Sequence, residues 1–134
     1  LQGQLPQCVH IEKLAGEMTV LFNWLERADA VILVDACRSG ALAGSIRRFD
    51  VVAAPLPSDA FAISTHGVGI NETLELLRVL GNLPPICIVY AIEATCFDAG
   101  AALSEPVAAA VPVVATAVQS EFECLQANME RFDA

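Results

Sequence analysis

The sequence is poor in basic residues. Seven Lys and Arg stand against 16 Asp and Glu, which gives a formal net charge of −9. A nucleic-acid-binding domain normally carries a basic surface that neutralises phosphates. The one basic concentration consists of Arg38, Arg47 and Arg48, and a solvated turn explains it about as well as a contact with a partner does. We therefore expect neither nucleic acid nor an anionic membrane as a partner.

Long apolar runs and paired cysteines are also missing. Asp35, Glu93 and Pro112 interrupt the apolar stretches well before the roughly 20 residues that a bilayer span requires. The five cysteines are widely spaced and form no CxxC pair, which gives no support for a zinc ribbon or a thioredoxin-like site. Their usage is typical of a reducing compartment, so we expect a cytoplasmic protein. The 134 residues, 55% of them hydrophobic, suffice for one core and one domain.

Two apolar runs, 30–35 and 86–92, predict buried strands. A strand that is apolar on both faces is typical of a parallel sheet with helices on either side. The stretch around Ile46 and Phe49 predicts a strand beside 30–35, antiparallel because the connection is too short for a crossover helix. A further short strand is expected over 8–14. We place the strand at 30–35 at the centre of the fold.

Helices are predicted between these strands. Apolar residues recur at helical spacing over 17–27 and 64–80, and Ser104 is a suitable cap for a last helix that starts near Glu105. Pro112 is expected to kink this last helix or divide it in two. The alternation of strands and helices predicts an α/β fold.

Three polar residues are candidates for chemistry. Asp35 and Glu93 close the two apolar strands, at the carboxyl edge of the sheet where ligands bind in such folds. His66 falls in the first turn of a predicted helix, where the helix dipole disfavours its charged form and leaves a lone pair for a metal or a proton. Two carboxylates and an imidazole on one rim could bind a divalent metal or support acid–base chemistry.

Simpler interpretations remain open at this point. Asp35 could be a turn or capping residue after the strand. His66 could be a capping residue, with Gly67 and Gly69 tolerated in the first turn at a cost of roughly 1 kcal/mol each. Cys37, two residues after Asp35, could mark a redox protein, but a single cysteine without a resolving partner is weak support for one.

Three segments taken together are more specific than any of these residues alone. They read VDACRSGALAGSIRRFD, STHGVGINETLELLRVLGNLP and IVYAIEATCFDAGAALSEPVAAAVPVV. In this order they resemble the maturation endopeptidases of [NiFe] hydrogenases, from about Cys8 to about Gln119.

The resemblance implies a three-layer α/β/α sandwich with a mainly parallel sheet. It also implies an enzyme that removes a C-terminal peptide from the [NiFe] hydrogenase large-subunit precursor after nickel has been inserted. The family's metal-binding Asp and His correspond to Asp35 and His66 in this sequence. The implied metal is nickel presented by the precursor, and the implied partner is that precursor.

One part of the family pattern has no counterpart in the sequence. The family begins with a strand, a Gly-Asn loop that carries an acidic ligand, and a helix, all before the strand expected at 8–14. The resemblance therefore implies a single domain over 1–134 that is N-terminally incomplete, and we expect this form to be inactive. The alternatives are a module that binds the hydrogenase precursor without cutting it, and a truncated product without function.

Overall fold

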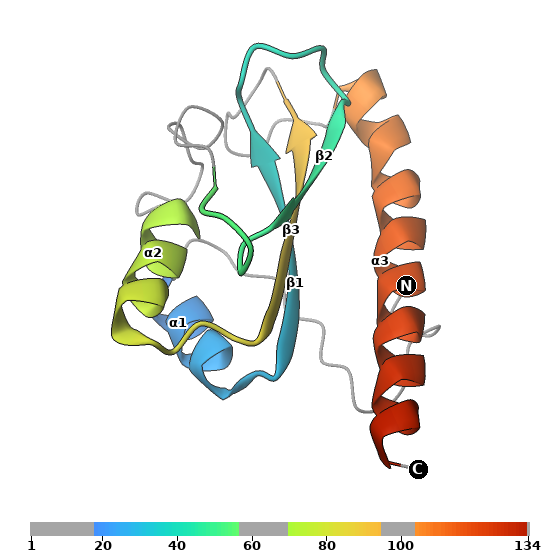
Figure 1. The fold of residues 1–134 in the computed structure, drawn as a ribbon. Helices are drawn as coiled ribbons and strands as arrows, with labels where there is room; N and C mark the ends of the chain where they lie inside the picture. Colours follow the sequence, from blue (N-terminus) through green and yellow to red (C-terminus); the bar gives the residue numbers. More distant parts are fainter. Residues whose placement is uncertain (1–17, 57–69, 95–103, 134) are drawn as a thin grey trace.

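The computed structural model describes residues 18–56, 70–94 and 104–133. In chain order the elements are α1 (Met18–Arg27), β1 (Ala30–Cys37), β2 (Ile46–Asp50), α2 (Ile70–Leu80), β3 (Ile86–Glu93) and α3 (Glu105–Asp133). Figure 1 shows α1 and α2 on one side of the sheet and the long α3 on the other. The expected strand over 8–14 lies outside the described residues.

In the sheet that the described residues form, the central strand is β3, which corrects the expectation that the 30–35 strand lies at the centre. The strand order is β1-β3-β2. β1 pairs with β3 in parallel, and β2 pairs with β3 in the antiparallel direction. The direction expected for β2 is thus confirmed, but its neighbour is β3 and not β1. Burial explains the difference, since seven of the eight residues in β3 are buried whereas only Cys37 is buried in β1.

The two faces of the sheet carry separate clusters of apolar side chains. On the face of α1 and α2, Leu25, Leu74 and Leu77 pack against Cys87 and Val89 of β3. The opposite face of the sheet packs on α3. That second cluster contains Ile88, Tyr90, Ile92, Ala94, Val107, Ala110, Val114 and Val118. Because side chains alternate along a strand, odd-numbered residues of β1 and β3 face α1 and α2, and even-numbered residues face α3.

Pro112 neither divides nor ends α3, which runs as one helix from Glu105 to Asp133. A proline removes one intrahelical hydrogen bond, here the bond to the carbonyl of Ala108. Ala108 is exposed, so water can satisfy that carbonyl. The hydroxyl of Thr116 donates a hydrogen bond to the carbonyl of Pro112, 3.0 Å away.

By length and composition alone, Glu105–Leu125 of α3 could also cross a membrane, with a mean hydropathy of 1.2. The core helix of a soluble protein passes the same test. Here Val107, Ala110, Val114 and Val118 form a stripe that packs on the sheet. A single helix of this kind is weak evidence for a membrane span.

The α/β class is confirmed, with three strands and three helices in the part of the chain that the structure describes. The sheet there is small and mixed, since it has one parallel and one antiparallel pair. The full three-layer sandwich with a mainly parallel sheet is therefore not confirmed.

Candidate functional site

Asp35 lies within β1, two residues before the strand ends at Cys37. Asp35 is therefore not a turn residue that follows the strand. In the register of the sheet Asp35 is opposite Ala91 of β3, and Ala91 is opposite Arg47 of β2. Asp35 is partly exposed and lies on the face of α1 and α2, near the carboxyl end of the parallel pair. This is the edge at which the sequence predicted it.

The chain that follows Asp35 crosses the end of β3. The backbone N–H of Gly44 donates to the carbonyl of Glu93 at 2.8 Å, and the N–H of Glu93 donates to the carbonyl of Ser45 at 2.8 Å. The N–H of Ala94 donates to the carbonyl of Cys37 at 3.0 Å. These bonds carry the chain from β1 over β3 to β2, which is how a short connection joins two strands that are not neighbours.

Gly44 allows this crossing to lie against the start of α3. Its φ of 87° is in the left-handed region that favours glycine. A Cβ at this position would lie 2.5 Å from the carbonyl oxygen of Pro106. The missing side chain therefore lets the crossing segment and the first turn of α3 meet.

The side chain of Glu93 also binds the connection between β1 and β2, residues 38–45, which crosses the end of β3. Its exposed fraction is 2%. The backbone N–H of Ser39 donates to Glu93 Oε2 at 2.9 Å and lies 3.2 Å from Oε1, and the Ser39 hydroxyl donates to Oε1 at 2.5 Å. The thiol of Cys37 adds a weaker bond to Oε1 at 3.7 Å. Both carboxylate oxygens are thus engaged within the chain, so Glu93 acts as a structural acceptor and not as a rim ligand.

These bonds also set the charge state of Glu93. Burial alone would raise the pKa of its carboxyl, but the donors of Ser39, Cys37 and Gly40 outweigh burial and hold the pKa below its ordinary value. Glu93 is therefore an ionised carboxylate in the core, stabilised by N–H, O–H and S–H donors.

Cys37 is poorly suited to thiol chemistry. It is fully buried. Burial first, and then the charge of Glu93, raise its pKa to about 11. Reactive cysteines are instead partly exposed and have lowered pKa values. The redox interpretation of Cys37 therefore has no support in the structure.

His66 lies outside the described residues, so its placement relative to Asp35 stays a prediction. Helix α2, which begins at Ile70, packs on the same face of the sheet that carries Asp35. Within the described residues, no group of three or more His, Cys, Asp and Glu side chains could hold a metal ion.

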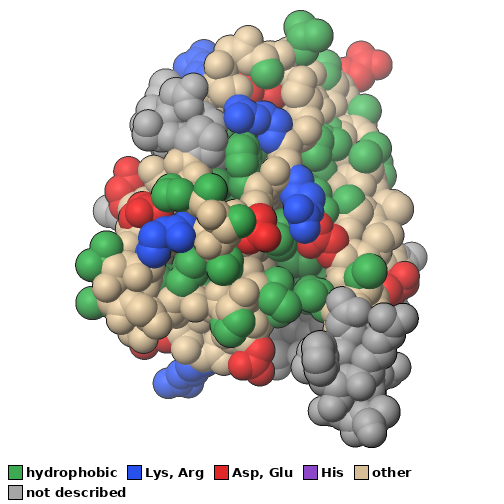
Figure 2. Space-filling model, in the orientation of Figure 1, with side chains coloured by type: hydrophobic (Ala, Val, Ile, Leu, Met, Phe, Trp, Pro, Cys, Tyr) green, Lys and Arg blue, Asp and Glu red, His purple; other side chains and the backbone are tan. Residues whose placement is uncertain are grey.

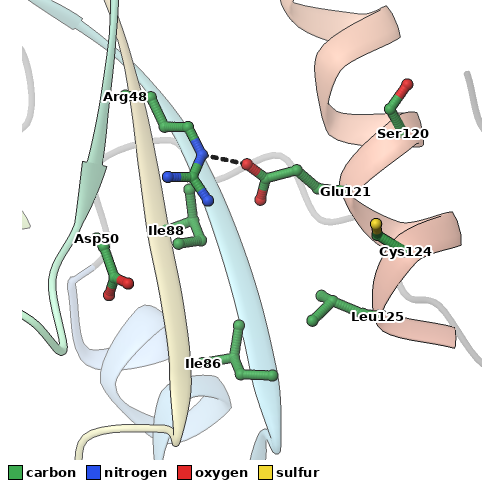
Figure 3. Close-up of a pocket in the computed structure, with 8 residues that line it drawn as sticks. All are labelled: Arg48, Asp50, Ile86, Ile88, Ser120, Glu121, Cys124 and Leu125. Carbon is green, nitrogen blue, oxygen red and sulfur yellow. Dashed lines mark hydrogen bonds and ion pairs between the residues drawn. The ribbon is translucent and has the colours of Figure 1, made fainter. Parts of the chain in front are cut away.

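A separate hollow lies on the opposite face, between the sheet and α3, and holds about 430 Å³ (Figure 3). Figure 3 shows Ile86, Ile88 and Leu125 forming its apolar wall, with Arg48 joined to Glu121 across it. The Tyr90 hydroxyl donates to the same Glu121 oxygen at 2.7 Å. The hollow lies on the face of the sheet that packs on α3 and near the amino end of β3. Asp35 lies on the other face and near the carboxyl end, so the hollow is not the candidate site.

The described part of the chain is thus an α/β protein with the carboxylate of Asp35 at the carboxyl edge of a parallel strand pair. Beside it lies the connection from β1 to β2, which is hydrogen-bonded to Glu93. Residues 15–121 match the family model of HycI, hydrogenase maturation protease, and the chain belongs to this family. No curated protein matched the chain. No solved structure matched it either.

Sequence reasoning missed Ser39 and Arg47. Ser39 gave no signal, because nothing local shows that its hydroxyl meets a carboxylate 54 residues away. Arg47 was noticed as part of a small basic concentration and as a residue of the predicted strand, but not as a candidate site residue. The useful signal was its alternation with Phe49 in β2, which places both on the face that carries Asp35.

Proposed function

We propose that the protein is the endopeptidase that removes the C-terminal peptide of a [NiFe] hydrogenase large-subunit precursor after nickel insertion. The observation that carries this proposal is the match of residues 15–121 to the HycI hydrogenase maturation protease family. A family of maturation proteases implies a peptidase that acts on a hydrogenase precursor. Removal of a C-terminal peptide, the requirement for nickel and action in the cytoplasm all belong to this proposal.

In this proposal Asp35 and His66 bind nickel that the precursor presents. Asp35 supports the assignment by its position at the carboxyl edge of the sheet, partly exposed and on the face against which α2 packs. Carboxylate and imidazole are both suitable ligands for a divalent transition metal. Bound nickel would serve as the mark that distinguishes a loaded precursor from an empty one. Glu93, by contrast, would hold the segment after Asp35 in place.

The test is cleavage of the nickel-loaded precursor by the full-length protein, followed by the mobility shift of the large subunit on a gel. We expect Asp35→Asn and His66→Ala each to slow cleavage by more than about 100-fold, since even outer contacts of metal sites contribute about 10- to 100-fold. Unchanged cleavage by His66→Ala would contradict the assignment.

Matched controls exist for both changes. Asp29 is exposed and precedes β1 at the opposite end of the same strand, so Asp29→Asn should leave cleavage unchanged. His10 is the other histidine of the chain, and His10→Ala serves as the control for His66→Ala. A wild-type protein that binds the precursor tightly without cutting it would instead favour a non-catalytic binding module.

A further inference from the structure

Among the residues that the structure describes, Arg47 has no carboxylate partner. In the part of the chain that the structure describes, Arg48 pairs with Glu121 and Arg78 pairs with Glu75, but no ion pair involves Arg47. Arg47 is also partly buried, unlike the exposed Arg27. The chain has 16 acidic residues and a net charge of −9, so carboxylates are abundant. An unpaired, partly buried guanidinium in such a protein needs an explanation, because its charge cannot be removed by deprotonation.

The guanidinium of Arg47 lies over an aromatic ring. Its Cζ lies 4.9 Å from the centroid of Phe49, in a cation–π contact. Phe49 itself packs against the core on the face of α1 and α2. A cation–π contact uses the charge of the guanidinium but not all of its five N–H donors, so Arg47 can still bind a planar acceptor. A carboxylate fits such a donor fork with two parallel hydrogen bonds.

The position of Arg47 relates it to Asp35. The two residues flank Ala91 in one transverse row of the sheet, and all three lie on the same face. Two interstrand spacings of about 4.8 Å separate their backbones, roughly 10 Å in total. A bound peptide could reach both residues within a few of its own residues.

We propose that Arg47 is a substrate-binding residue that takes a carboxylate of the precursor beside Asp35. This inference rests on the proposed function and adds to it the chemical class of the group that is recognised, a carboxylate. Asp35 would bind the nickel of the precursor. Arg47 would bind a carboxylate of the same precursor on the other side of Ala91, and so fix the position of the peptide along the edge of the sheet. Figure 2 shows basic side chains that lie apart and are interspersed with acidic ones on the face it displays, which suits a single local contact better than a broad electrostatic surface.

The experiment measures cleavage of the nickel-loaded precursor by the full-length protein carrying Arg47→Met or Arg47→Lys. Methionine keeps an unbranched chain against Phe49 but removes the charge, so we expect KM to rise about tenfold or more with kcat changed less than about twofold. Lysine keeps the charge without the fork, so its KM should lie between the two. Arg27→Met, at the exposed end of α1 that precedes the amino end of β1, is the control and should leave both constants unchanged.

Salt separates binding from a structural role. The KM of the wild type should rise with ionic strength, and that of Arg47→Met should rise less, because the screened contact is gone. The melting temperature of Arg47→Met should match that of the wild type. An unchanged KM in Arg47→Met, or the same salt dependence in both proteins, overturns the proposal.

Two sources of the carboxylate are distinguished by competition. A synthetic peptide with the last residues of the precursor is tested as the free acid and as the C-terminal amide. Inhibition by the acid alone, lost in Arg47→Met, identifies the terminal carboxylate; equal inhibition by both, also lost in Arg47→Met, identifies an acidic side chain. Inhibition that does not depend on Arg47 overturns the proposal.

Binding of the precursor can be measured even if the protein does not cut it, so the carboxylate contact and the peptidase activity are tested separately. If the wild type does not cut the precursor, the dissociation constant of the complex is measured for wild type and Arg47→Met by biolayer interferometry. A weakening of about tenfold then supports the carboxylate contact while the peptidase proposal fails. Equal affinities, or no binding by the wild type, overturn the contact as well.

Discussion

Glu93 and Ser39 are joined across 54 residues by the backbone N–H and the hydroxyl of Ser39, which both donate to the buried carboxylate. Glu93 ends the central strand, and Ser39 lies in the segment that follows β1, two residues after Cys37. The pair therefore fixes the edge of the sheet on which the proposed site lies.

Glu93→Gln should destabilise the fold by about 1–3 kcal/mol, because an amide presents N–H groups toward the donors of Ser39. Urea denaturation followed by circular dichroism at neutral pH measures the difference. The exposed Glu26 on α1 provides the control, and Glu26→Gln should leave the midpoint unchanged. Equal midpoints for Glu93→Gln and wild type would show that the carboxylate contributes nothing.

The same pair predicts a dependence of stability on pH. Because the pKa of Glu93 is lowered in the folded state, its stabilisation is fully present above its unfolded pKa and is lost as the pH falls through its folded pKa. The gap in unfolding free energy between wild type and Glu93→Gln should therefore be largest near neutral pH and should narrow below about pH 4. At pH 3, about one unit below the unperturbed pKa of a glutamate, the gap should be clearly smaller than at neutral pH. A gap that stays constant from neutral pH to about pH 3 would contradict this prediction.

Gly44→Ala should be more damaging than Gly40→Ala. Both glycines have positive φ, 87° and 92° respectively, so alanine should cost about 1 kcal/mol or more at either position. Only at Gly44 would the new Cβ also meet the backbone of Pro106, whereas at Gly40 it would meet open space. The difference between the two denaturation midpoints therefore isolates the contact between the crossing segment and α3. Equal losses would mean that α3 moves away freely.

The thiols should react unequally. With a pKa of about 11, Cys37 and Cys87 are each about 0.1% thiolate at pH 8, against roughly a quarter for an ordinary free cysteine. Iodoacetamide followed by peptide mass spectrometry should thus modify the exposed Cys124 in the folded protein, and the buried Cys37 and Cys87 only after unfolding in urea. Fast modification of Cys37 in the folded protein would revive the redox interpretation.

Glu121 should contribute more through Tyr90 than through Arg48. The side chain of Arg48 is 50% exposed, so its ion pair is expected to contribute only about 0–1 kcal/mol. The Tyr90 hydroxyl bond is part-buried, and burial together with Glu121 raises the pKa of Tyr90. Tyr90→Phe should cost about 1 kcal/mol. A double-mutant cycle with Glu121→Gln measures the coupling, and Glu123→Gln, on the exposed side of α3, is the control.

Local elements could be predicted from the sequence, and their pairing could not. The apolar runs and helical spacings placed α1, β1, β3 and the start of α3 within one or two residues, because these depend on neighbours along the chain. The strand order depends on where the chain crosses β3, and that is decided by backbone bonds between Gly44, Ser45 and Glu93. Two apolar runs of similar composition do not reveal which one is central.

The candidate site divides in the same way. Asp35 could be placed at the carboxyl edge of the sheet because one buried strand fixes its position. Glu93 was assigned to the rim with it, yet its carboxylate is occupied by Ser39, which no local pattern indicates. The companion role of His66 stays a prediction, since it lies outside the described residues.

The central place of β3 also has a consequence for folding during synthesis. Neither β1 nor β2 has a neighbour in the described sheet until residues 86–93 exist, because both pair with β3 alone. A ribosome making this chain therefore releases both strands well before the segment that joins them. Such late, non-local closure slows folding and leaves strand edges open to aggregation, so the nascent chain is a natural client for chaperones.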